Sequence, residues 1–217
     1  MEAGVRSRIF RIAVTAICGV AALWTITACD VGAKQQAQHG SGPASTSASV
    51  EAAGSQTLTP TQWGPLSEAD MKLMTIVRQT SIREITTSQW AMQRSSNAKV
   101  KQAAQTIVTQ HVDLQGRDLD VAGKLGLKLP DQPSADMQVG IDRMRNETGT
   151  TFDEDYVNTL RQAHADALVL SAKVRANTQN SLVRTFAGVA HDYIQTHVEM
   201  LDATGDVDYS KLPVPQA

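Results

Sequence analysis

Three long stretches of the chain repeat apolar side chains at alternating spacings of three and four residues, which places those side chains on one face of an α-helix. A fourth, which comes before them in the chain, contains no Pro or Gly and carries a stripe of small residues. The stretches cover approximately residues 67–95, 98–125, 151–177 and 181–204. No alternating strand pattern of any length accompanies them. Four amphipathic helices of this length favour a four-helix bundle, so the sequence predicts an all-α fold.

Residues that start and stop helices support these boundaries. Ser67 and Asp70 stand in the Ser-x-x-acid relation of a capping box, and Thr151 and Glu154 predict a second capping box at the third long helix. Gly126 ends the second helix, with a proline four residues further on.

A long connection separates the second and third long helices. Its middle part, "ADMQVGIDRMRN", has the pattern of a short amphipathic helix. Ferritin-like bundles have a long central crossover. The predicted fold is therefore a ferritin-like four-helix bundle with a long central connection that contains a short helix.

The first 28 residues have the layout of a secretory signal. Three arginines within residues 1–11 precede an uncharged run at 12–25, which is shorter than the roughly 20 apolar residues that a membrane-spanning helix needs. Ile26-Thr27-Ala28-Cys29 then resembles the lipobox of bacterial lipoproteins, whose cysteine receives a diacylglycerol before the chain is cut in front of it. The resemblance implies lipidation at Cys29 and anchoring to the cell membrane on its exported side, extracytoplasmic or periplasmic. The alternatives are an ordinary cleaved signal or an uncleaved anchor, with Cys29 incidental.

The remaining chain divides into three predicted parts. Residues 29–62 are rich in Ser, Ala, Gly and Gln, which predicts a flexible tether, residues 63–207 form the bundle, and residues 208–217 are an extended tail. Loss of residues 1–28 removes three arginines and one glutamate and changes the formal charge from −2 to −4. This acidic balance offers no electrostatic footprint for nucleic acid. Cys18 would be lost with the signal, so no disulfide and no thiolate metal site is expected.

Each predicted long helix carries one ionisable residue on or beside its apolar face. His111 and His197 lie on the inward stripes of the second and fourth helices, His164 lies beside the stripe of the third, and Glu84 lies on a stripe of small residues in the first. Counted from the nearer turn, Glu84 lies thirteen residues away, His111 fourteen, His164 fifteen and His197 eighteen. All four therefore fall near mid-bundle, with His197 displaced by about one turn, roughly 5 Å. Metal sites in bundles are built from side chains on facing helices in this way.

Two interpretations of these four residues remain open, besides a third in which they are scattered, half-exposed side chains that do not meet. Three imidazoles and one carboxylate suit a single Zn, Cu, Ni or Fe ion better than Mg or Ca. A metal-free hydrogen-bonded network would also satisfy them. Ferritin-like oxidases use Glu-x-x-His on two helices, but Val108, Arg161 and Ile194 stand three residues before the histidines, so a di-iron ferroxidase is not predicted.

The chain also resembles a family of secreted bacterial proteins, domain of unknown function family 4142, which is assigned to the ferritin-like superfamily. The resemblance covers about residues 66–204 and rests on a combination of motifs: Ser81-x-x-Glu84-x-x-x-Ser88-x-x-Ala91, "VKQAAQTIVTQH", "GLKLP", "FDEDY" and "FAGVAHDYIQTHV". The family usually has glycine in place of Ser81 and Ser88, and often aspartate in place of Gln110. The resemblance implies the fold and brings no assigned activity.

The sequence thus predicts a membrane-anchored envelope lipoprotein with a ferritin-like binding domain, which holds a transition metal at Glu84, His111, His164 and His197 under one of the two interpretations above. The alternative is a metal-free structural or interaction module that packs with itself or with an envelope protein. A metal-dependent redox enzyme is the weakest interpretation, because the sequence has no nucleophile with a partnered base, no phosphate loop and no cofactor fingerprint.

Overall fold

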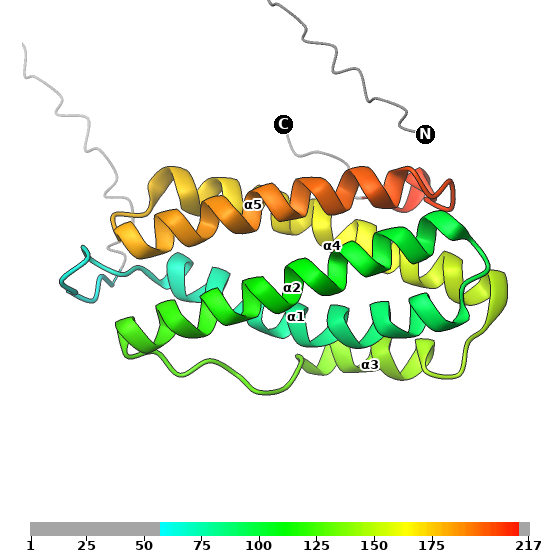
Figure 1. Ribbon diagram of the computed structural model, residues 1–217. Helices are drawn as coiled ribbons and strands as arrows, with labels where there is room; N and C mark the ends of the chain where they lie inside the picture. Colours follow the sequence, from blue (N-terminus) through cyan, green and yellow to red (C-terminus); the bar gives the residue numbers. More distant parts are fainter. Residues whose placement is uncertain (1–56, 213–217) are drawn as a thin grey trace, which may run out of the picture. The chain divides into compact units, whose positions relative to one another are not determined.

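The computed structural model describes residues 57–212, which fold into an all-helical bundle (Figure 1). Within this range the elements are α1 (Glu68–Arg94), α2 (Ala98–Leu125), α3 (Ala135–Met144), α4 (Gly149–Asn177), α5 (Ser181–Asp202) and the short 3-10 helix η1 (Tyr209–Lys211). The same range contains no strand, only one isolated bridge between Thr59 and Leu66. The predicted all-α fold is confirmed for these residues. The predicted signal, Cys29 and the tether up to residue 56 lie outside the described residues, as does the tail from residue 213.

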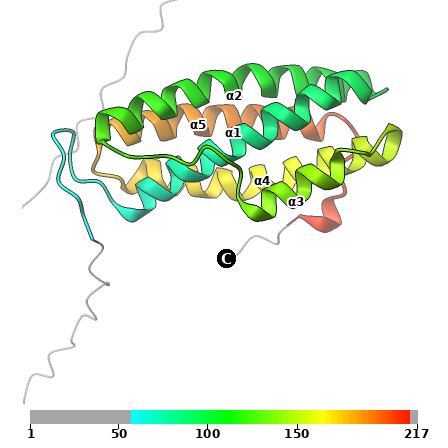
Figure 2. The same cartoon turned by 90° about the horizontal axis from the view of Figure 1, so that it is seen from below.

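The bundle consists of two helical hairpins. The α1–α2 hairpin and the α4–α5 hairpin pack against each other, with α2 beside α5 and α1 beside α4. The connection from α2 to α4 runs along the bundle and contains α3, which packs on α1 and α4 (Figure 2). None of the described helices combines the length and the apolar character needed to cross a membrane.

Helix ends follow local capping chemistry, with one departure from the sequence prediction. The capping box at Ser67 is present, because the Asp70 amide donates to Ser67 Oγ and the Ser67 amide donates to Asp70 Oδ2. Gly126 ends α2 in the left-handed conformation at φ 69°. The predicted capping box of Thr151 and Glu154 is wrong. Helix α4 starts at Gly149, with φ 62°, and its cap position is Thr148, three residues before Thr151, so Thr151 and Glu154 both lie inside the helix.

The bundle begins earlier than residue 63, its predicted first residue. The amides of Thr59 and Leu66 each donate to the other residue's carbonyl at 2.8 Å, and Leu66 is buried in the core. Asn180, in the turn between α4 and α5, donates through its side chain to the Gly64 carbonyl. Gly64 has φ 100°, and a Cβ there would collide with the Gln179 carbonyl, so this close approach requires glycine. The ordered contacts therefore extend to Thr59.

The apolar core is divided into two clusters by a polar layer. One cluster gathers around Leu73, Leu114 and Phe186, and the other around Ile107 and Phe152. In each long helix the predicted site residue lies between the residues that belong to one cluster and those that belong to the other. The polar layer is thus sealed at both ends by apolar packing.

Candidate metal centre

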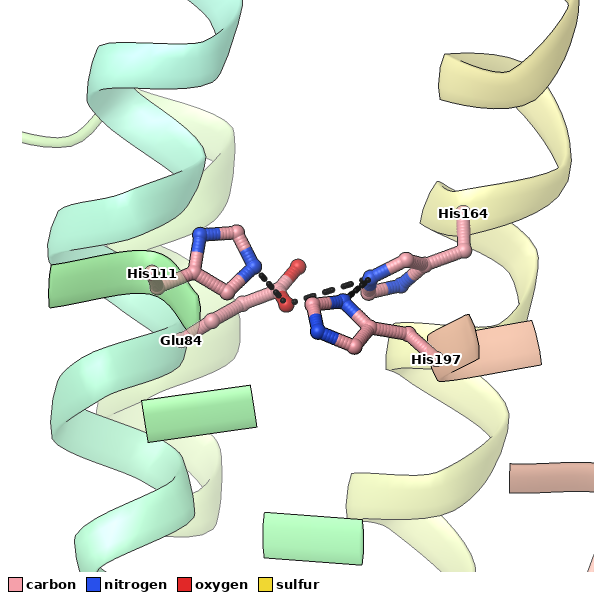
Figure 3. Close-up of side chains that lie close together, drawn as sticks. All are labelled: Glu84, His111, His164 and His197. Carbon is pink, nitrogen blue, oxygen red and sulfur yellow. Dashed lines mark hydrogen bonds and ion pairs between the residues drawn. The ribbon is translucent and has the colours of Figure 1, made fainter. Parts of the chain in front are cut away.

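The structure brings together the four residues singled out in the sequence. Glu84 comes from α1, His111 from α2, His164 from α4 and His197 from α5, and one potential ligand atom from each lies within 4.8 Å of all the others. All four side chains are buried, and they point toward one another across the bundle (Figure 3). Whether they bind metal stays a prediction.

Side-chain direction explains why these four residues lie level. Glu84 lies ten residues before the end of α1, and His111 lies thirteen after the start of α2. His164 lies thirteen residues before the end of α4, and His197 lies sixteen after the start of α5. In both hairpins the second residue is thus three positions further from the turn. Helical side chains lean toward the N-terminus of their own helix. In an antiparallel pair this lean brings the two side chains together, which compensates for the offset expected for His197.

Two imidazoles are held in a defined tautomer by their outer nitrogens. The Ser81 hydroxyl donates to the Val77 carbonyl and lies 3.0 Å from His111 Nδ1, so that nitrogen is the donor. His164 Nδ1 lies 2.7 Å from the Leu160 carbonyl, which can only accept. In the neutral rings these partners assign the lone pairs to His111 Nε2 and His164 Nε2. Both of these nitrogens face Glu84.

Glu84 is oriented by its neighbour in the sequence. Arg83 Nη2 donates to Glu84 Oε1 at 2.8 Å, although Arg83 itself is only 6% exposed. The other oxygen, Oε2, lies 2.9 Å from His111 Nε2 and 3.4 Å from His164 Nε2. Burial on its own raises the pKa of Glu84, but the positive charge that His164 and His111 carry when protonated, together with Arg83, outweighs it and holds this pKa well below its usual range. Glu84 is therefore a carboxylate with one oxygen turned to the cluster.

The imidazoles of His164 and His197 stay neutral because they are buried. Burial lowers the pKa of His164, and it lowers the pKa of His197 to about 2. His197 Nδ1 lies 2.9 Å from His164 Nε2 and is the donor of that pair, since His164 Nε2 carries a lone pair. Within the described part of the chain, Glu84 Oε2, His111 Nε2 and His197 Nε2 are buried without a hydrogen-bond partner. In the tautomers assigned above, each of these three atoms carries a lone pair, and those of Glu84 and His111 lie 2.9 Å apart.

The donor set fits one metal ion and does not fit two. Nitrogen and oxygen ligands in this ratio suit Zn, Cu, Ni or Fe. Di-iron bundle sites use four carboxylates, and the cluster found among residues 57–212 contains one. The outer contacts of His111, His164 and Glu84 are of the kind that orient ligands in metal proteins.

Sequence reasoning missed the residues that support the four. Arg83 lies off the apolar stripe, where a charged residue is normally solvated, so its burial left no signal in the sequence. Ser81 lies on the inward stripe of the first helix, but a serine at such a position is normally interpreted as a small packing residue. His191, six residues before His197, lies outside the cluster, and its Nδ1 lies 3.1 Å from Ser171 Oγ.

Comparison with known proteins gives one family. The family described as "Domain of unknown function (DUF4142)" matches residues 55–204, which include all five α-helices and the four clustered residues. No curated protein and no solved structure matches the chain.

Proposed function

The chain belongs to the DUF4142 family, and we propose that its bundle binds a single transition-metal ion, Zn, Cu, Ni or Fe, through Glu84, His111, His164 and His197. The observation that carries this proposal is the contact between Glu84 Oε2 and His111 Nε2, two buried atoms 2.9 Å apart. A carboxylate oxygen and a neutral imidazole lone pair repel each other unless a proton or a cation lies between them. The Nε2 lone pair of His164 accepts from His197 Nδ1 at 2.9 Å, so a bound ion would take the place of that hydrogen bond.

A metal-free polar network is the second candidate, and it also has an observation in its favour. His197 Nδ1 and His164 Nε2 already form a hydrogen bond, and Arg83 already neutralises Glu84. A proton on His111 Nε2 would then complete the network. The two candidates therefore differ in what lies between Glu84 and His111.

Metal content separates the two candidates directly. The purified full chain, loaded with Zn, Cu, Ni or Fe and then desalted, is expected to retain one ion per chain by elemental analysis. His164→Gln should retain much less than one ion, because one of four ligands is lost. His191→Gln changes the same residue type outside the cluster and should retain one. A double variant, His111→Gln with His197→Gln, that still held one ion per chain would place the metal elsewhere.

The ferritin-like assignment of the bundle is part of the same proposal. It is supported by the long connection between α2 and α4, which contains α3 and joins two antiparallel hairpins. The single carboxylate of the cluster separates this domain from the di-iron proteins of that fold.

We further propose that the protein is a lipoprotein held at the exported face of the cell membrane through Cys29. The support is the sequence of residues 1–29, in which a charged start and a short apolar run lead to Ile26-Thr27-Ala28-Cys29. Two acyl chains would anchor the protein much more firmly than one. Its bundle would then bind its ion, or an envelope partner, outside the cytoplasm.

Cells fed a palmitate analogue should incorporate the label into the wild-type protein and not into Cys29→Ala. Cys29→Ala should also accumulate as a precursor that keeps residues 1–28, because cleavage follows lipidation. Cys18→Ala is the matched control, since Cys18 lies inside the apolar run, and it should be labelled normally. Equal label on the wild type and Cys29→Ala would refute the lipid anchor.

A further inference from the structure

A pocket opens between α1 and α4 and leads to the polar layer. Half-buried side chains form its outer part, namely Ile76 and Thr80 from α1 and Ala163, Ala167 and Leu170 from α4. Ala163 and Ala167 are one helical turn apart on α4, and their short side chains leave space in front of α1. The pocket is therefore a gap in the packing of the bundle.

The inner end of this pocket is the candidate metal centre itself. Glu84, His111 and His164 line it, and two of the atoms without hydrogen-bond partners in the described chain, Glu84 Oε2 and His111 Nε2, belong to these residues. Apart from these three ligands, Thr80 is the one polar side chain in the lining. The free volume of the pocket is about 30 Å³, which is room for roughly one or two water-sized molecules.

We infer that a small uncharged molecule of diatomic size, such as a dissolved gas, enters through this pocket and binds at the metal centre. A charged molecule would lose its hydration inside the pocket and would find almost no hydrogen-bond partner there. A small apolar molecule meets no such penalty, because dry apolar cavities accept it. The inference rests on the proposed metal binding for its final step, while entry into the pocket does not depend on metal.

Xenon tests entry without any metal. Xenon NMR of the metal-free full chain is expected to show one binding site, which Ala167→Phe should abolish by filling the outer pocket. Ala167→Leu is a milder plug in case the phenylalanine variant does not fold, and circular dichroism checks both. Ala172→Phe is the matched control on the same helix, because Ala172 is exposed and lies outside this pocket. Equal xenon binding by the wild type and both plugged variants would overturn the inference.

Nitric oxide tests access to the metal. With one Fe(II) ion bound per chain, nitric oxide should change the absorption spectrum, and Ala167→Phe or Ala167→Leu should slow that change at least tenfold by stopped flow while metal content stays the same. Thiocyanate, a small permanent anion, should bind far more slowly than nitric oxide. Unchanged rates in the plugged variants, equally fast thiocyanate binding, or an iron-loaded chain that ignores nitric oxide would each overturn the inference and leave metal binding intact. A chain that binds xenon and no metal would instead overturn the proposed function, and with it the final step of this inference.

Discussion

Zinc, copper, nickel or iron is expected to raise the melting temperature of the purified chain, and a chelator is expected to reverse the rise. An ion that binds the folded cluster and not the unfolded chain adds, at about 1,000 times its Kd, roughly 4 kcal/mol to the free energy of unfolding. For a domain of this size, 1 kcal/mol corresponds to roughly 2–4 °C, so a rise of about 10 °C is expected. Thermal melts followed by circular dichroism measure it.

His111→Gln and His197→Gln should each remove this response to metal. The matched control is His191→Gln, whose parent side chain bonds to Ser171 outside the cluster, and it should respond like the wild type. A metal-free network predicts a different pattern. In that case metal and chelator change nothing, and the two substitutions still lower stability by about 1–3 kcal/mol because buried partners are left unpaired.

Asp118→Asn is expected to stabilise the protein by about 1–3 kcal/mol at pH 7. Asp118 lies in α2 and is completely buried, and neither carboxyl oxygen has a hydrogen-bond partner in the described chain. Burial raises the pKa of Asp118 to about 8, against a smaller lowering by Arg78. At pH 7 the Asp118 side chain is protonated in the folded chain. In the unfolded chain the same side chain loses its proton near pH 4, about three pH units lower. At about 1.4 kcal/mol per unit, this is a penalty on the order of 4 kcal/mol. Asparagine has nearly the shape of the protonated acid and does not titrate, so it removes this penalty. Its buried amide, which has no hydrogen-bond partner there in the described chain, costs about 1–3 kcal/mol of that gain.

The sign of the pH dependence distinguishes this explanation from a simple packing effect. The folded pKa of Asp118 lies above the unfolded one, so its contribution to stability falls as pH rises from about 4 to 8 and is constant outside that window. Urea unfolding from pH 4.5 to 8.5 should show the stability of Asp118→Asn rising away from that of the wild type with increasing pH. Asp120→Asn on the same helix is the control, because Asp120 is exposed and pairs with Lys124, and it should change stability by less than about 1 kcal/mol. A constant difference between Asp118→Asn and the wild type across the range would contradict the assignment.

Helices were predictable because their signal is repetitive. The three-and-four spacing located three of the long helices, and Ser67 and Gly126 marked two helix ends correctly. Thr151 and Glu154 gave a wrong prediction because the capping-box pattern requires only two residues. In the structure α4 has already begun at Gly149. Residues 59–62 were placed in the tether because they are polar, and the backbone pairing of Thr59 with Leu66 leaves no pattern in the side chains.

Grouping of the four site residues was predictable because an ionisable residue on an apolar stripe is an anomaly, and each long helix has one near its middle. Arg83 was not predictable, since its burial depends on how α1 sits in the bundle and not on its place in the sequence. The pocket also depends on tertiary packing. Ala163 and Ala167 are ordinary helix residues, and the gap exists only because α1 lies opposite them.

The division of the four residues between two hairpins has a consequence for when the cluster can form during folding. Glu84 and His111 belong to the first hairpin, and His164 and His197 belong to the second. Each hairpin can form early from neighbouring residues, but the cluster requires groups from Glu84 to His197, so it exists only after the two hairpins dock. A chain exported in an unfolded state would therefore carry no ion across the membrane. The metal it acquires would be decided by the ions available in the compartment where docking is completed, as much as by the ligands themselves.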